Sequence, residues 1–233
     1  MCPGAAETVG AIQAQLSDRN SRIVEVASGK GEAAATLADR TGCRVVCIET
    51  NGAFVRHSVA KFRRRNLFDS IHVVQADGRQ LPLRSATVNG DYCIGAPSIV
   101  GLEPALREMA RVVVEGGWVI VSDVIWRTRP GPLGLEWGWV GSAAQTTRHH
   151  YVATLNEAGL LVDEVVVHGR DAWERYWMPM RGIVDRAPIG GRDAFVIELE
   201  QHLILEHRAV DAWLDYATFI THKPSTRAGL DPG

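Results

Sequence analysis

Two glycines that follow an apolar segment, Gly29 and Gly31, are the first residues whose types and spacing point to ligand chemistry. Residues 21–27 are typical of a buried strand, and a helix is predicted to begin after Gly31. Glycine accepts positive φ and lets a ligand approach the backbone, while a helix N-terminus offers free N–H groups. The pattern favours a site for a ligand resembling an adenine nucleotide, although a tight turn without a ligand has the same sequence.

Two carboxylates follow the next two predicted strands. Glu49 ends the apolar segment 43–49, 18 residues after Gly31, and Asp77 follows the segment 71–76. Because the carboxyl ends of parallel strands meet at one edge of a sheet, we expect both acids near the glycine turn. Glu49 can accept from both hydroxyls of a ribose, and Asp77 from an adenine amino group. The alternatives are a surface acid at a strand end and a turn-forming Asp-Gly pair.

Glu25 lies inside the first apolar strand, where a carboxylate is costly unless a partner pairs with it. A cationic amino-acid group bound beside the glycine turn would be such a partner, whereas a diphosphate would be repelled. Residues 29–34 also fit the G-x-G-x-x-G/A pattern of nicotinamide or flavin binding. The Tyr-x-x-x-Lys pair of a short-chain dehydrogenase is absent from the sequence. A nicotinamide-dependent oxidoreductase therefore remains the alternative.

Strands and helices alternate along the chain, which predicts an α/β fold with a parallel sheet covered on both faces. The predicted strands are 21–27, 43–49, 71–76, 88–94, 118–125, 161–167 and 210–222. The predicted helices are 5–16, 32–39, 52–65, 102–114 and 146–158, and residues 171–207 are expected to be helical in pieces. The glycine pair 116–117 is expected to end the helix that precedes the fifth strand.

The second half predicts additions to one domain rather than a second domain. Residues 127–141 contain prolines, glycines and tryptophans, which is typical of a loop or lid. The helical stretch 170–208 is predicted as an insert before the last strand. A single domain is expected over 1–223, followed by a flexible tail at 224–233.

Composition excludes several classes of protein. A net charge of −2 argues against a dedicated nucleic-acid binder, which would be basic. No apolar run of about 18 residues predicts a membrane span, and the N-terminus lacks the pattern of a signal peptide. The four cysteines are therefore expected to be reduced thiols in a cytoplasm. The basic stretch 61–65 is expected to be a solvated helix face.

The chain resembles class I S-adenosylmethionine-dependent methyltransferases over about residues 4–223. Residues 25–31 match the family's first motif, in which an acid precedes spaced glycines, and Glu49 and Asp77 match its ribose and adenine acids. Residues 106–117 and Ser122-Asp123 resemble its helix, glycine turn and fifth-strand end. The resemblance implies a Rossmann-like doubly wound seven-stranded sheet with a reversed last strand. Within this family, the chain looks most like small bacterial enzymes that methylate small molecules.

The cofactor implied by the resemblance is S-adenosylmethionine, with S-adenosylhomocysteine as product. The sequence departs from the family at Ala27, which replaces the first glycine and is tolerated if its φ is negative, and at Glu115, which replaces a usual proline. The expected cofactor-binding residues are Glu25, Ala27, Ser28, Gly29, Gly31, Glu49, Thr50, Asp77, Gly78, Gly95 and Ala96.

The methyl acceptor is expected beyond the carboxyl ends of the later strands, under the loop and the helical insert. Aromatic rings and one acid gather in these segments; ordinary core or lid packing is the alternative for each of them. The expected acceptor-binding residues are Trp126, Glu136, Trp137, Tyr151, Trp173, Tyr176 and Trp177. Asp123, His149 and His150 are the candidates for removing a proton from the acceptor.

The activity implied by the resemblance is in-line transfer of a methyl group to a small-molecule acceptor. No metal, nucleic acid or membrane partner is expected, and the protein is expected to be a monomer or homodimer. A non-catalytic protein that keeps the cofactor pocket for binding or regulation is a further alternative.

Overall fold

The computed structural model describes residues 2–16, 20–128, 146–187 and 192–225. Its seven-stranded sheet has the order β3-β2-β1-β4-β5-β7-β6, with β7 antiparallel to both of its neighbours. The strands are β1 (Arg22–Val26), β2 (Arg44–Glu49), β3 (Ile71–Gln75), β4 (Val88–Ile94), β5 (Val113–Trp126), β6 (Leu161–His168) and β7 (Leu214–His222). The predicted doubly wound sheet with a reversed last strand is confirmed.

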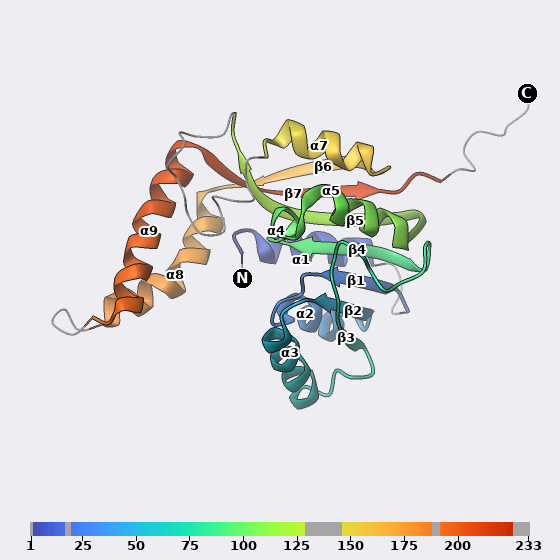
Figure 1. The fold of residues 1–233 in the computed structure, drawn as a ribbon, viewed down its shortest axis with the longest axis horizontal. Coiled ribbons are helices and arrows are strands. Elements are labelled where there is room, and N and C mark those ends of the chain that lie inside the picture. Colours follow the sequence, from blue (N-terminus) through green and yellow to red (C-terminus); the bar gives the residue numbers. More distant parts are fainter. Residues whose placement is uncertain (1, 17–19, 129–145, 188–191, 226–233) are drawn as a thin grey trace, which may run out of the picture.

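Helices cover both faces of this sheet (Figure 1). The helices are α1 (Ala5–Gln15), α2 (Glu32–Thr41), α3 (Gly52–Arg64), α4 (Pro97–Val100), α5 (Leu102–Val112), α7 (Arg148–Glu157), α8 (Arg170–Arg186) and α9 (Ala194–Ala212). One apolar core lies between the sheet and α1, α2 and α3, and a second lies beneath α5 and α7. The central strands are apolar on both faces because both faces are buried.

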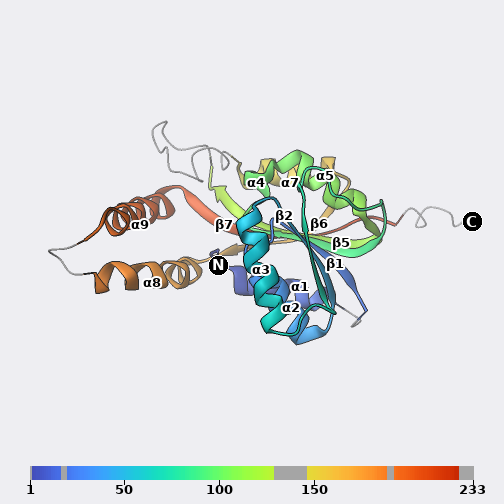
Figure 2. The ribbon, with the colours of Figure 1, turned by 60° about the horizontal axis from the view of Figure 1, so that its bottom comes forward.

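A helical pair, α8 and α9, projects from one end of the sheet (Figure 2). It lies between β6 and β7, where the sequence predicted a helical insert. A third apolar cluster, which includes Trp173, Trp177 and Tyr216, joins this pair to the sheet. Because α8 follows the carboxyl end of β6, the pair stands beside the edge at which β1 to β5 also end.

Two local expectations were wrong, and one short helix was not predicted. The helix before β5 ends at Val112, and Gly116 lies within β5 rather than between helix and strand. Residues 210–212 continue α9, so the last strand begins at Leu214 instead of residue 210. The short helix α4 was not predicted, because four residues are too few to show a helical period.

Candidate cofactor site

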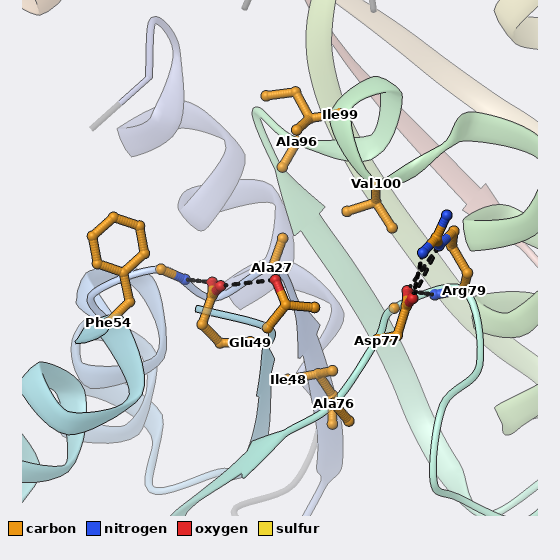
Figure 3. Close-up of a pocket in the computed structure, with 13 residues that line it drawn as sticks. Ala27, Ile48, Glu49, Phe54, Ala76, Asp77, Arg79, Ala96, Ile99 and Val100 are labelled. Atoms are coloured by element: carbon orange, nitrogen blue, oxygen red, sulfur yellow. Dashed lines mark hydrogen bonds and ion pairs between the residues drawn. The ribbon is translucent and has the colours of Figure 1, made fainter. Parts of the chain in front are cut away.

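A cleft of about 430 Å³ opens at the carboxyl ends of β1 to β4 (Figure 3). Glu49 and Asp77 lie on two sides of it, with Ile48 and Ala76 between them at its base. Its lining residues are Ala27, Gly29, Ile48, Glu49, Thr50, Phe54, Ala76, Asp77, Gly78, Arg79, Ala96, Ile99 and Val100. Seven of the eleven expected cofactor residues are among them, and Glu25, Ser28, Gly31 and Gly95 are not.

The glycine turn is held by its own backbone. The Gly31 N–H donates to the Ser28 carbonyl at 2.8 Å, and the Ser28 N–H donates to the Ile48 carbonyl at 3.0 Å. Gly29 has a φ of 54°, and a β-carbon built on it would meet no atom within 4 Å, so the turn faces open space. Gly31 instead packs against Phe62 and is the N-cap of α2. The turn therefore offers the cleft an uncovered backbone at Gly29.

Ala27 lines the same cleft in the left-handed region, with a φ of 54°. An alanine at this position was expected to be tolerated if its φ is negative. The φ is positive, so this condition is not met. A left-handed conformation places Cβ against the following carbonyl and costs about 1–2 kcal/mol for a residue other than glycine. The turn keeps the geometry of a glycine although an alanine occupies the position.

Glu49 is buried, and its carboxylate is fixed by two backbone donors. Oε2 accepts from the Gly29 N–H at 2.8 Å, and Oε1 accepts from the Asn51 N–H at 2.8 Å. The Thr50 hydroxyl also donates to Oε1 across a long contact of 3.5 Å, which a ligand hydroxyl can replace, and Oε2 has a further lone pair. The carboxylate thus ties the end of β2 to the glycine turn and can still accept two hydroxyl groups.

Asp77, across the cleft, is paired with Arg79. The Arg79 Nη2 lies 2.6 Å from Asp77 Oδ2, and the Arg79 backbone N–H donates to Oδ1 at 2.9 Å. These bonds to Arg79 lower the pKa of the Asp77 carboxyl below its usual value. The carboxylate is therefore ionised at neutral pH and is held at the mouth of the cleft by a residue that the sequence reasoning missed.

Glu25 lies beneath the turn rather than in the cleft. Its side chain is buried, and Cys47 Sγ lies 3.7 Å from Oε2. Burial raises the pKa of the Glu25 carboxyl to about 8, and hydrogen bonds with Tyr92, Cys47 and the Ala34 backbone limit this rise. At neutral pH the carboxyl is mainly protonated, so its burial does not require a bound cation.

Lys61 supports the turn from α3. Its Nζ donates to the Lys30 carbonyl at 2.8 Å and forms an ion pair with Glu32. The expectation that 61–65 is a solvated face is wrong for Lys61 and Phe62, which are both buried. The prediction treated the basic stretch as one unit, whereas the exposed residues are Arg63, Arg64 and Arg65.

Asp123 anchors α4 at the end of β5. Its Oδ2 accepts from the Ser98 N–H at 2.9 Å, and Oδ1 accepts from the Val124 N–H at 2.8 Å. Burial raises the pKa of the Asp123 carboxyl to about 6. Since Ile99 and Val100 of α4 line the cleft, Asp123 positions one of its walls. The two candidate histidines, His149 and His150, are exposed in the first turn of α7 and line none of the cleft.

The aromatic residues expected at the acceptor have different surroundings. Tyr151 stacks on Phe219 with ring centroids 4.2 Å apart, in the core beneath α5 and α7. Trp126, Trp173 and Trp177 are buried in the cluster that joins α8 and α9 to the sheet.

The remaining acceptor candidates are placed differently. Tyr176 lines a second cavity, of about 230 Å³, between the start of α1 and α8. Glu136 and Trp137 lie outside the described residues.

The cleft fits the adenosine part of S-adenosylmethionine. Glu49 presents a carboxylate suited to two hydroxyl donors, and Asp77 presents one suited to an amino donor. The apolar side chains of Ile48, Ala76 and Val100 offer surfaces on which a flat ring can pack. Two carboxylates would repel a phosphate group. The donor set thus favours a ligand rich in hydroxyl and amino groups.

Two kinds of site are missing from the described part of the chain. Within residues 2–16, 20–128, 146–187 and 192–225, no three His, Cys, Asp or Glu side chains come close enough together to hold a metal ion. Over the same ranges, no helix has both the length and the apolar run needed to cross a membrane.

Sequence comparison places this cleft within a known family model. Residues 23–117 match the model described as a methyltransferase domain, and this range holds every residue that lines the cleft. The ubiquinone/menaquinone biosynthesis C-methyltransferase UbiE of Idiomarina loihiensis is 29% identical over 108 residues, which cover 45% of this chain and 43% of that protein. The chain therefore matches less than half the length of this curated relative.

Solved structures share the fold over nearly the whole chain. A methyltransferase from Geobacter sulfurreducens in complex with S-adenosylhomocysteine has a TM-score of 0.70 and 20% identity, covering 93% of this chain and 90% of that one. The [4+2]-cyclase SpnF has a TM-score of 0.76 and 19% identity, covering 94% of this chain and 81% of that one. At these identities the likeness concerns the fold.

Proposed function

Because this chain belongs to the class I S-adenosylmethionine-dependent methyltransferase family, we propose that it transfers a methyl group from S-adenosylmethionine to a small-molecule acceptor. The observation that carries the proposal is the Glu49 carboxylate, which faces a cleft of about 430 Å³ while two backbone N–H groups hold it. A carboxylate fixed in this way is pre-organised for a ribose, because it loses little freedom when the hydroxyls bind.

The proposed binding mode assigns a task to each wall. Glu49 and Thr50 hold the ribose, Asp77 and Gly78 meet the adenine edge, and Gly29 lets the amino-acid part approach the backbone. Glu25, Ser28 and Gly31 act from beneath by shaping the turn. Gly95 and Ala96 border the reacting end, where β4 runs into α4.

The protein's task in such a reaction is mainly to position the reactants. S-adenosylmethionine, when bound, supplies a methyl group on a positively charged sulfur that is already a strong electrophile. The cleft residues orient it and exclude water, so that an acceptor can approach in line with the carbon–sulfur bond. Asp123, His149 and His150 are the candidates for taking a proton from the acceptor, and Asp123 is the one buried at the strand ends.

Calorimetric titration with S-adenosylmethionine, S-adenosylhomocysteine and NAD tests the cofactor assignment. We expect micromolar binding of the first two ligands, no binding of NAD, and loss of binding in Glu49→Ala. The matched control is Glu198→Ala, because Glu198 is exposed on α9. Binding of NAD alone would overturn the proposal in favour of an oxidoreductase.

Radiolabelled methyl transfer to a panel of small molecules then tests catalysis. We expect label in at least one acceptor, with release of S-adenosylhomocysteine. Tight cofactor binding without transfer to any acceptor would favour a non-catalytic binding protein.

A further inference from the structure

Helix α9 carries apolar residues on two opposite sides. Its inner side is buried and consists of Val196, Leu203, Glu206, Ala209 and Val210. Its outer side includes Ile197, Ile204 and Leu205, which are 44%, 49% and 41% exposed. A helix on the surface of a globular protein ordinarily has one apolar side, which faces the core. The second apolar side of α9 therefore points to a contact that the described residues do not make.

The exposed residues form one continuous stripe along the helix. Ile197, Gln201, Ile204 and Arg208 follow one another at spacings of four, three and four residues, which places them on one side. We call this stripe the outer face of α9 and define it as Ile197, Glu198, Gln201, Ile204, Leu205 and Arg208. Figure 1 shows α9 at the outer edge of the molecule, with α8 on its inner side. The outer face is thus turned away from the sheet.

The outer face has an unpaired charge of opposite sign near each end. Glu198 lies near the start of α9 and Arg208 near its end, about 15 Å apart along the axis. Neither side chain forms an ion pair with another described residue. The other carboxylates of α9 all have partners, in the pairs Glu200–Arg192, Asp211–Arg170 and Glu206–Trp177. The two unpaired charges therefore remain available to a partner.

A second copy of α9 supplies a matching surface. In an antiparallel pair whose two-fold axis passes at the level of residue 203, Glu198 of each copy faces Arg208 of the other. Gln201 then faces Leu205, and Ile204 lies beside the axis and meets its own counterpart. A parallel pair would instead place Glu198 against Glu198 and Arg208 against Arg208, which repel each other. The charges thus favour one orientation of the partner.

A membrane surface fits this helix less well. Helices that lie on membranes are rich in Lys and Arg on their polar side, because the lipid surface is anionic. Helix α9 has one arginine and no lysine, against four carboxylates, which are Glu198, Glu200, Glu206 and Asp211. An anionic surface would repel such a helix, whereas a second copy brings its own arginine to the acid.

We propose that the protein forms a two-fold symmetric dimer in which the outer faces of two α9 helices pack antiparallel. The apolar residues Ile197, Ile204 and Leu205 supply the centre of the interface, and the two Glu198–Arg208 pairs fix its orientation. This dimer does not depend on methyl transfer, because no residue of α9 lines the cofactor cleft. It would hold the projecting α8–α9 pair of each copy against that of the other (Figure 2).

Sedimentation equilibrium of the full chain tests the location. We expect the mass of two chains for the wild type at about 50 μM. Ile204→Lys places two ammonium groups near the axis and should raise the dissociation constant of the dimer at least tenfold. The matched control is Leu161→Lys on β6, because Leu161 is 48% exposed and lies outside the outer face. The control should dimerise like the wild type, and both variants should keep the wild-type melting temperature.

Charge exchange tests the orientation. Glu198→Arg and Arg208→Glu each place like charges opposite one another in the antiparallel pair, so each should raise the dissociation constant at least fivefold. The double variant restores both pairs with reversed polarity and should return the constant to within threefold of the wild type. All variants should bind S-adenosylhomocysteine equally, since the outer face and the cofactor cleft share no residue.

Every other outcome overturns part of the proposal. A wild-type protein that remains a monomer at about 50 μM would overturn the dimer, and its sedimentation with phosphatidylcholine–phosphatidylglycerol vesicles would assign the face to lipid instead. A dimer that survives Ile204→Lys but not Leu161→Lys would place the interface at the edge strand β6. Single charge exchanges without effect, or a double variant that stays dissociated, would overturn the antiparallel orientation.

Discussion

The Gly29 amide donates to the Glu49 carboxylate over 2.8 Å, so the glycine turn after β1 and the acid at the end of β2 are one structural unit. The second oxygen of Glu49 accepts from the N–H of Asn51, which is the N-cap of α3. Three elements therefore depend on this single side chain for their relative position at the cleft.

Replacing Glu49 by glutamine should damage this unit, although the shape is conserved. A glutamine has one acceptor oxygen, so its NH2 group would face the N–H of either Gly29 or Asn51. We expect a loss of about 1–3 kcal/mol in unfolding free energy, because a buried donor is left without an acceptor. S-adenosylhomocysteine affinity should fall at least tenfold by calorimetry. Glu198→Gln on the exposed face of α9 is the control, and equal behaviour of the two variants would contradict this role.

Replacing Ala27 by glycine should stabilise the protein slightly. Relief of the left-handed strain is worth about 1–2 kcal/mol, and the added freedom of the unfolded chain costs about 0.4–1 kcal/mol. We expect a net gain of about 0.5 kcal/mol in chemical denaturation. Ala33→Gly, inside α2, should instead lose about 0.5–1 kcal/mol. A loss of stability in Ala27→Gly would show that the φ of 54° carries no strain.

Removing the Lys61 amine should loosen the turn. In Lys61→Met the Lys30 carbonyl loses its buried donor, and Glu32 loses its ion partner. We expect about 1–2 kcal/mol lower stability and weaker S-adenosylhomocysteine binding. The control is Arg64→Gln, an exposed position on the same helix. Unchanged binding in Lys61→Met would restrict Lys61 to a purely stabilising contact.

The buried Glu25 carboxyl should make stability depend on pH. Its pKa is about 8 in the folded protein and near 4.5 when exposed, so the folded state holds the proton through this range. Stability contributed by Glu25 is full below about pH 4.5 and is lost as pH rises toward 8. Glu25→Gln carries no such proton, so its stability relative to the wild type should rise by about 2–4 kcal/mol between pH 5 and 8. Parallel curves for the two proteins in urea denaturation would contradict the shift.

The Asp77–Arg79 pair should affect binding but not folding. Both side chains are largely exposed, and exposed ion pairs contribute little to stability. We expect Asp77→Asn to weaken S-adenosylhomocysteine about three- to tenfold with an unchanged melting temperature. Glu103→Gln, which removes an exposed acid paired with Arg107, should change neither quantity. An equal loss of affinity in both variants would indicate a general charge effect.

The parts of the fold and site that sequence reasoning predicted follow from short-range patterns. Alternating apolar segments predicted the sheet. The two acids at the ends of β2 and β3 were expected near the turn; Glu49 accepts from Gly29, and Asp77 lies across the same cleft. The resemblance to class I methyltransferases is confirmed by the family match over residues 23–117. These predictions were possible because apolar periodicity and the residues at strand ends can both be recognised from the sequence alone.

The parts that were missed depend on contacts between distant elements. The φ of Ala27 is set by bonds from Ser28 and Gly29 to β2, which outweigh an alanine's own preference. Lys61 is buried where its amine donates to the carbonyl of Lys30, which lies 31 residues away in the sequence. Neither contact can be recognised from the residues that neighbour Ala27 or Lys61 in the sequence.

The hydrogen bond between Thr8 and Thr218 has a consequence for the order in which the molecule is made. These residues are 210 positions apart, so the start of α1 cannot reach its final place until β7 has been synthesised. Strands β1 to β4 can pair much earlier, because their partners lie close in sequence. During translation, the strands around the cofactor cleft can therefore pair before α1 takes its final position. A chain that stalls on the ribosome before β7 is made would lack the contact that holds the start of α1, and with it the second cavity.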